Sequence, residues 1–141
     1  MSWDVLVFNF DGPVPPDETL KQKGYQPPPL GTAHLVREKI SRSVPGIDWS
    51  NPGWGILRMG SLLIEFGLQE DGIVDCLGIH VYGRGNPMPV IQHICSDNGW
   101  SAFDTSSGDW LDYENPSDAG WQSFQSFRDN LIEEHKRRGD C

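Results

Sequence analysis

The stretch GILRMGSLLIEFGLQEDGIVDCLGIHVY, residues 55–82, decides the fold of this 141-residue chain. It contains three apolar segments, 55–59, 61–68 and 73–82, which are separated by Gly60 and by the QEDG sequence at 69–72. Glycine and acidic residues between apolar runs are typical of tight turns that join neighbouring strands. The stretch therefore predicts a meander of three antiparallel strands.

The two turns also predict how these strands pair. Pairing around the first turn sets Leu57 opposite Leu62, and pairing around the second sets Ile64 opposite Leu77 and Leu62 opposite Ile79. Both pairings place Leu57, Leu62 and Ile79 on the same face, and such agreement between neighbouring strands supports a register. We expect this face to be buried.

The chain before the meander begins with an apolar run at 3–10, which is typical of a strand buried on both faces. Residues 11–31 hold six prolines and predict a long surface loop. Thr32 is a suitable cap for a helix that continues through about Val44. The sequence IDWSNPGWG at 47–55 predicts a turn-rich connection to the meander.

After the meander, Asn86 caps a short helix over about 87–96, and GWSAFDTSSGDWLD at 99–112 predicts a hairpin with Trp100 and Phe103 on opposite faces. A last helix extends from about 116 to 138. The order is strand, helix, three strands, helix, two strands, helix. It predicts one α+β domain over residues 1–141, in which about three helices pack against a mainly antiparallel sheet with a central β-meander.

The charge of the chain restricts its partners. A net charge of −9 disfavours nucleic acids and anionic membrane surfaces, which both require clustered Lys and Arg. No Lys or Arg occurs between Arg84 and Arg128, whereas the same stretch holds six acids: Asp97, Asp104, Asp109, Asp112, Glu114 and Asp118. This segregation indicates either a solvated acidic face or a docking surface for a basic protein partner.

The cellular location follows from two further patterns. No apolar run approaches the ~20 residues that span a bilayer, and the N-terminus lacks the basic region of a signal peptide. Three cysteines, without a CxxC pair, suit reduced thiols in the cytoplasm and give no metal framework. We therefore expect a cytoplasmic protein without a cofactor.

No catalytic set emerges from the sequence. The segment DTSSG at 104–108 differs in spacing from the DTG of aspartic proteases and has no second copy, so a turn is favoured. The predicted register sets Glu65 opposite Cys76, which leaves Glu65 and His80 ~13 Å apart, beyond hydrogen-bond reach. Cys76 and His80 are separated by the same ~13 Å along one strand. The four histidines show no zinc-binding spacing.

The sequence YGRGNP at 82–87 combines a strand end, two glycines and a helix start. This order resembles an anion-binding loop, for which Gly83, Arg84 and Gly85 would be the contacts. Met88 stands where a dinucleotide-binding motif has its third glycine. A plain turn and a small-anion site both remain open.

Landmarks along most of the chain resemble those of small bacterial proteins that accompany polymorphic toxin systems. They are MSWDVLVFNF, PPPLG, IDWSNPGWG, IEFGL and GWSAFDTSSGDWLD. The resemblance implies an immunity protein, which neutralises a toxin by binding it. No functional residue is carried over from it, because these landmarks are aromatic and turn residues that specify a fold.

Three functional hypotheses follow. In the first, the chain is a non-catalytic protein that binds a basic partner through Asp104, Asp109, Trp110, Asp112 and Glu114. In the second, it is a small enzyme or ligand binder with a pocket near 83–87 and the 11–31 loop. In the third, it is an adaptor domain with an unrelated partner. The acidic segment favours the first, and the lack of an assembled acid, base and nucleophile disfavours the second.

Overall fold

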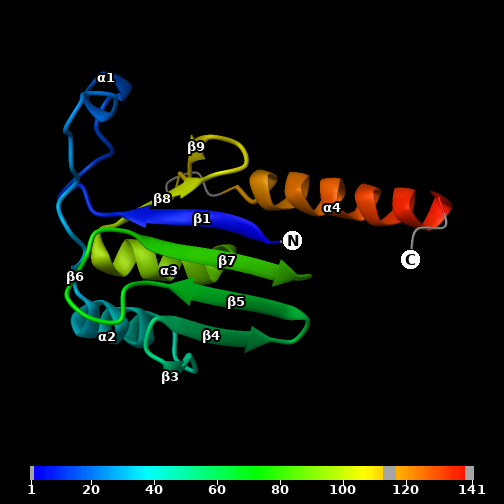
Figure 1. Cartoon of the computed structure of the whole chain (residues 1–141), viewed down its shortest axis with the longest axis horizontal. Coiled ribbons are helices and arrows are strands. Elements are labelled where there is room, and N and C mark those ends of the chain that lie inside the picture. Colours follow the sequence, from blue (N-terminus) through cyan, green and yellow to red (C-terminus); the bar gives the residue numbers. More distant parts are fainter. Residues whose placement is uncertain (1, 113–116, 139–141) are drawn as a thin grey trace.

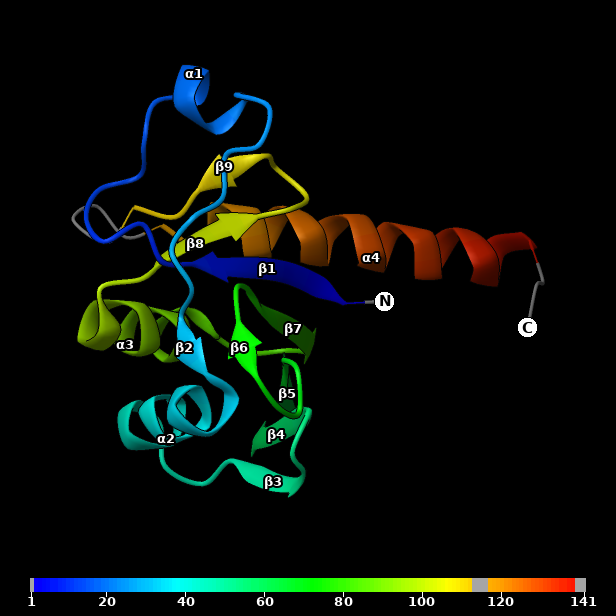
Figure 2. The same cartoon turned by 60° about the vertical axis from the view of Figure 1, so that its left-hand side comes forward.

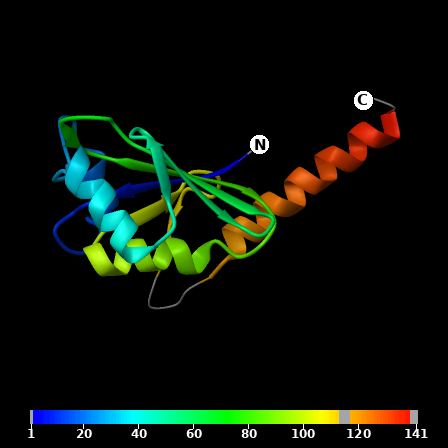
Figure 3. The same cartoon turned by 90° about the horizontal axis from the view of Figure 1, so that it is seen from below.

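A computed structural model describes residues 2–112 and 117–138 of the chain as a sheet with helices on one of its faces (Figures 1 and 3). The sheet is antiparallel and has seven strands in the order β3-β4-β5-β7-β1-β8-β9. Its strands are β1 (Trp3–Phe8), β3 (Asp48–Asn51), β4 (Trp54–Met59), β5 (Leu62–Gly67), β7 (Leu77–Gly83), β8 (Ser101–Asp104) and β9 (Asp109–Trp110). The α+β class and the mainly antiparallel sheet are confirmed.

The helices and a small second sheet complete the fold. The helices are α1 (Asp17–Leu20), α2 (Ala33–Ser43), α3 (Met88–Asn98) and α4 (Ala119–Arg138). The strands β2 (Gly31–Thr32) and β6 (Ile73–Val74) pair with each other, away from the large sheet (Figure 2). The predicted 11–31 loop thus contains one short helix and ends in a strand. No helix within the described ranges is long and apolar enough to cross a membrane.

The predicted meander is present as β4, β5 and β7, but its register differs from the prediction. Leu57, Leu62 and Ile79 all lie in the buried core, as expected. Leu57 pairs with Ile64, two residues away from the predicted partner, and Ile79 pairs with Phe66, four residues away. Because side chains alternate with a period of two, these even shifts leave every residue on its predicted face.

The connections between the strands explain both shifts. β4 and β5 are joined by a two-residue turn that follows the Met59–Leu62 pair, whereas the prediction placed the turn one residue earlier. The second connection is longer than expected, because β6 leaves the meander and pairs with β2. Backbone hydrogen bonds from Leu30 N to Val74 O and from Ala33 N to Gly72 O secure it. Residues 73–82 therefore do not form one strand.

β1 lies between β7 and β8, and its side chains alternate between buried and half-buried. Val5 and Val7 are fully buried, whereas Asp4 and Leu6 are half-buried on the opposite face. The expectation of a strand buried on both faces was wrong, because α2 and α3 cover one face of the sheet (Figure 3). The opposite face of β1 keeps partial contact with solvent.

The helix caps agree well with the sequence. The Thr32 hydroxyl accepts a hydrogen bond from Leu35 N at 3.3 Å and starts α2. The Asn86 side chain accepts from Met88 N at 3.1 Å, although α3 begins one residue later than predicted, at Met88. The connection at 47–55 differs from the turn-rich segment that was predicted. It contains the strand β3, in which Asp48 pairs with Ile56 of β4.

Candidate functional site

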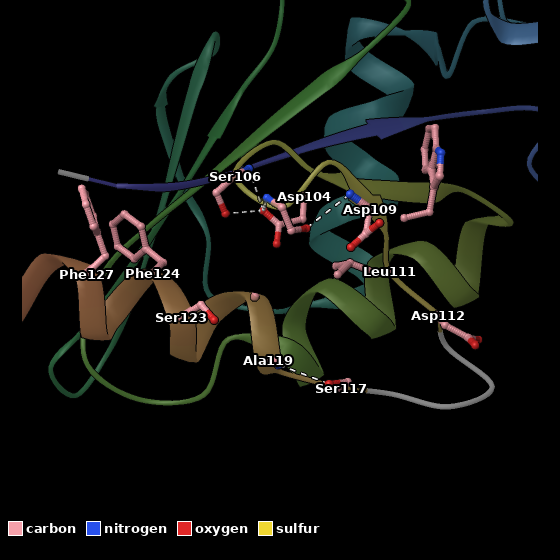
Figure 4. A pocket seen from close by; sticks show the side chains of 13 residues that line it. Asp104, Ser106, Asp109, Leu111, Asp112, Ser117, Ala119, Ser123, Phe124 and Phe127 are labelled. Carbon is pink, nitrogen blue, oxygen red and sulfur yellow. Dashed lines mark hydrogen bonds between the residues drawn. The ribbon is translucent and has the colours of Figure 1, made fainter. Parts of the chain in front are cut away.

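A groove with a volume of about 690 Å³ separates the β8–β9 hairpin from α4 (Figure 4). We call it the hairpin–helix groove. Asp109, Trp110, Leu111 and Asp112 contribute to its hairpin side, and Ser123, Phe124 and Phe127 to its helix side. These two sides come from segments that are neighbours in sequence but are joined through residues that the structure does not describe.

The hairpin is shaped by Asp104, which is 1% exposed. Its Oδ1 accepts hydrogen bonds from Ser106 N (2.9 Å), Ser106 Oγ (2.7 Å) and Ser107 N (3.4 Å), while Gly108 closes the turn at φ +76°. From the neighbouring strand β1, Trp3 Nε1 donates to the same oxygen at 2.9 Å. Burial raises the pKa of Asp104, but these hydrogen bonds outweigh it and hold the pKa below its usual range. The Asp104 carboxylate is therefore charged, and it accepts hydrogen bonds from groups of its own chain.

The position of α4 depends on a close approach at Gly120. A Cβ atom at this position would collide with Asp104 Oδ2, so only glycine fits here without movement. The next residue, Trp121, is 1% exposed, and its ring centroid lies 5.7 Å from that of Trp3. Its Nε1 donates to Gly85 O at 2.8 Å. The start of α4 is thus fixed against both the hairpin and the β7–α3 loop.

The structure brings together three of the five residues predicted to bind a partner. Asp109 and Asp112 are exposed beside the groove, and Trp110 is half-buried there. Asp104 borders the groove but is buried, so its predicted role in partner contact is corrected to one of support for the hairpin. Glu114 lies outside the described residues.

Trp110 is both anchored and accessible. Its ring meets Phe8, Phe10 and Phe103 edge-on, with centroid separations of 6.0, 5.4 and 5.0 Å. Edge-to-face contacts of this kind fix the ring orientation. Trp100, in contrast, is 4% exposed, which confirms that it lies on the face opposite Phe103.

The helix side of the groove was not predicted from the sequence. Phe127 is 59% exposed, although its place in an apolar helical stripe with Trp121 and Phe124 indicated burial. Phe124 stacks on Trp121 with a centroid separation of 5.8 Å and so remains partly covered. Helical spacing gives no signal for this exposure, because it does not show how far along the helix the body of the protein extends.

The loop at 83–85, for which a plain turn and a small-anion site both remained open, clamps α4 to the body. Arg84 donates two hydrogen bonds to Asp129, at 2.8 and 3.0 Å, and Arg128 Nη1 donates to Gly83 O at 2.7 Å. The hydrogen bond from Arg84 holds the pKa of Asp129 below its usual range. Gly85 contributes its carbonyl to Trp121. The guanidinium of Arg84 is thus bound to a carboxylate of the same chain.

A smaller hollow of about 370 Å³ lies next to this loop, near the place expected for a ligand pocket. Asn86, Met88, Gln92 and Asp118 are among its lining residues. None of the side chains that line it is cationic, so the described part of the hollow offers no counter-charge for a phosphate or carboxylate.

The estimate that separated Glu65 from His80 was wrong, because the register places them directly opposite each other on β5 and β7. His80 Nδ1 lies 2.7 Å from Asp4 Oδ1, and the His80 ring stacks on Trp54 with a centroid separation of 5.3 Å. Gly67 leaves room on the sheet for the Trp54 ring, and Gly78 for the His80 ring. Asp4 therefore orients His80, while Trp54 covers it.

In the described part of the chain, the hydrogen bonds of His80 do not include one to a nucleophile. A base oriented by a carboxylate acts together with a nucleophile within hydrogen-bond distance, and the hydrogen bond of the His80 side chain is to Asp4. Burial raises the pKa of Cys76, which keeps this thiol in its unreactive form. In residues 2–112 and 117–138, no group of three or more His, Cys, Asp or Glu side chains is arranged to hold a metal ion.

No protein-family model, curated protein or solved structure matches this chain. The hairpin–helix groove is therefore the feature of the described residues that indicates a function.

Proposed function

We propose that this protein is a non-catalytic binding protein whose hairpin–helix groove takes a basic segment of a partner protein. The observation that supports this proposal most is that one groove has an acidic side and an apolar side. Asp109 and Asp112 offer negative charge on the hairpin side, while Phe124 and Phe127 offer apolar surface on the helix side. Lys and Arg side chains have a charged head on an apolar stem, and this groove matches both parts.

The distribution of charge over the chain supports the same proposal. Residues 85–127 carry six acids and no Lys or Arg, and the groove lies within this acidic region of the sequence. An acidic surface accelerates encounter with a basic partner, while aromatic residues at the centre of the contact slow dissociation. The exposed Phe127 and the anchored Trp110 are suited to that second role.

An immunity protein that neutralises a basic toxin would use such a groove, and the resemblance of the sequence landmarks supports this assignment. We therefore expect the product of an adjacent gene to be the partner and to carry a basic surface. The protein would inhibit it by occupying that surface and would need no catalytic group of its own.

The test measures association and dissociation rates with the purified adjacent gene product. Replacing both Asp109 and Asp112 with Lys should slow association, most strongly at low ionic strength, because exposed charges are screened by salt. Phe127→Ala should accelerate dissociation and weaken binding by at least about tenfold, as expected for a central aromatic contact.

The matched control replaces Asp17 and Glu18 with Lys, which makes the same change of charge on the exposed helix α1. This control should leave the association rate near that of the wild-type protein. The proposal fails if the adjacent gene product does not bind, or if its binding is equally sensitive to both double substitutions.

A further inference from the structure

Helix α4 extends beyond the part of the molecule that holds it. Within the described residues, its side-chain hydrogen bonds to the body are made by Trp121, Arg128 and Asp129, which pair with Gly85, Gly83 and Arg84. From Asp129 to the helix end at Arg138 the axis advances a further ~14 Å, at 1.5 Å per residue. Figures 1 and 3 show this half of α4 projecting away from the sheet and from α2 and α3.

An apolar stripe continues from the attached half of α4 into the projecting half. Phe124, Phe127 and Leu131 follow one another at i, i+3 and i+7, and Ile132 borders them. Phe127 is 59% exposed and Ile132 is 46% exposed, so the stripe continues past the point where the body covers it. Most helices in proteins depend on packing of their apolar face, which this half of α4 does not find within the described chain.

The two ends of α4 lie near opposite charges. The groove at the beginning of the helix has Asp109 and Asp112 on its hairpin side. The last turn of the helix carries three cationic residues in sequence, Lys136, Arg137 and Arg138. One chain therefore holds an acidic region at one end of an apolar stripe and a basic segment at the other.

We propose that two copies of this chain pair through antiparallel α4 helices. A two-fold axis near Leu131 would cover Phe127, Leu131 and Ile132 of both copies, and bring the basic helix end of each copy alongside the acidic groove of the other. A surface that is complementary to itself about a two-fold axis gives a closed dimer. The inference goes beyond the proposed function, because it concerns self-association and does not depend on a second protein.

Pairing has a consequence for the groove. The helix end of one copy approaches the same acids that would meet a basic partner. The dimer then competes with partner binding, and the partner separates the two copies.

The first experiment measures the mass of the full chain in solution by sedimentation equilibrium over a range of concentrations. The wild-type protein should be in equilibrium between monomer and dimer. Ile132→Asp places a charge in the proposed contact and should raise the dissociation constant of the dimer by at least about tenfold. Ile132 is not among the residues that line the groove, so the monomer of this variant should bind a basic partner with the same affinity as the wild-type monomer.

The matched control is Ser126→Asp, which adds the same charge on the same helix. Ser126 is also exposed, and it lies about 140° around the helix axis from Leu131 and about 120° from Ile132, away from the proposed contact. This variant should dimerise like the wild-type protein. A wild-type chain that stays monomeric at every concentration, or an Ile132→Asp variant that dimerises normally, overturns the proposal.

A charge exchange tests the antiparallel direction. Replacing Lys136, Arg137 and Arg138 with Glu should weaken the dimer at low ionic strength, and so should replacing Asp109 and Asp112 with Lys. Combining the two sets in one chain restores opposite charges across the two-fold axis and should recover the dimer. If the combined variant is weaker than either set alone, the antiparallel arrangement is excluded.

Discussion

Asp104 connects three separate parts of the molecule through a single carboxylate. Its Oδ1 accepts from Trp3 on β1 and from Ser106 in the hairpin turn, and its Oδ2 lies against Gly120 at the beginning of α4. A buried carboxylate is stable only when hydrogen bonds replace its lost hydration. The turn sequence DTSSG supplies these donors from its own backbone and hydroxyl groups, which explains why small hydroxyl residues follow Asp104.

The charge of Asp104 should contribute to stability in a pH-dependent way. Asp104→Asn keeps the size of the side chain but loses hydrogen bonds to a charged acceptor, and should lower the free energy of unfolding by about 1.5–3 kcal/mol at neutral pH. The folded-state pKa is lowered, so this contribution is fully present above the unfolded-state pKa of about 3.9 and is lost as pH falls through the folded value. Urea unfolding of both proteins between neutral and strongly acidic pH measures the difference.

The difference in stability between wild type and Asp104→Asn should therefore shrink in the range below about pH 4. Asp71→Asn, at an exposed position in the β5–β7 connection, serves as the control and should change stability by less than about 0.5 kcal/mol. A difference for Asp104→Asn that stays constant down to the lowest pH would show that shape, and not charge, accounts for its effect.

Among the elements, the meander shows which features of a sheet a sequence determines. The face on which Leu57, Leu62 and Ile79 lie could be predicted, because the alternation of side chains is a local property. The register could not, because it depends on β6 pairing with β2, some 40 residues earlier in the chain. The wrong register also separated Glu65 from His80, so a real neighbour pair was discarded.

The candidate site, too, could be predicted only in part from the sequence. The hairpin acids and Trp110 were identified from composition and turn residues, which are local signals. The burial of Asp104 was missed, because it depends on Trp3, which is 101 residues away. The helix side of the groove was also missed, because exposure of Phe127 depends on where the body ends rather than on helical spacing.

The end of the β5–β7 pair depends on a glycine that no other residue can replace without strain. Gly83 adopts φ +87°, and a Cβ atom there would collide with Ser61 O. Gly60, in the neighbouring turn, also has a positive φ of +59°, but a Cβ atom would meet nothing within 4 Å. Substitutions at these two positions therefore distinguish the effect of backbone conformation from that of a steric collision.

Gly60→Ala should cost about 1–2 kcal/mol, the usual penalty of a left-handed conformation. Gly83→Ala should cost this amount plus about 1–3 kcal/mol, because the strand end must move to relieve the collision. Thermal or urea unfolding measures both values. If both variants lose the same free energy of unfolding, the backbone at Ser61 moves away from the new Cβ atom without a loss of stability.

At the scale of the whole molecule, the sheet with α2 and α3 forms one packed body, and α4 is attached to it over its first half. Most of the buried core residues come from the large sheet, α2 and α3, and Trp121 is the residue of α4 among them. The clamp between the β7–α3 loop and α4 holds the helix beside the hairpin and so maintains one side of the groove. The groove thus depends on an attachment that adds little to the core.

Removing the Arg84–Asp129 ion pair tests whether the attachment of α4 is independent of the stability of the core. The Arg84 side chain is 62% exposed, and exposed ion pairs contribute only about 0–1 kcal/mol to folding. Arg84→Ala should therefore leave the global free energy of unfolding almost unchanged. Its effect should appear locally, because the pair is one of the few bonds that fix α4: backbone amides of residues 119–129 should exchange with deuterium faster, while those of β5 and β7 keep the protection set by global unfolding.

Arg58→Ala is the matched control, since Arg58 is exposed on β4 and distant from α4 along the sheet order. It should change neither the global stability nor the exchange of α4 by more than the error of the measurement. The comparison must be made at a concentration where the wild-type protein is monomeric, because pairing of two helices would itself slow exchange in α4. If Arg84→Ala instead accelerates exchange in α4, β5 and β7 to the same extent, α4 unfolds together with the sheet, and the groove is as stable as the core.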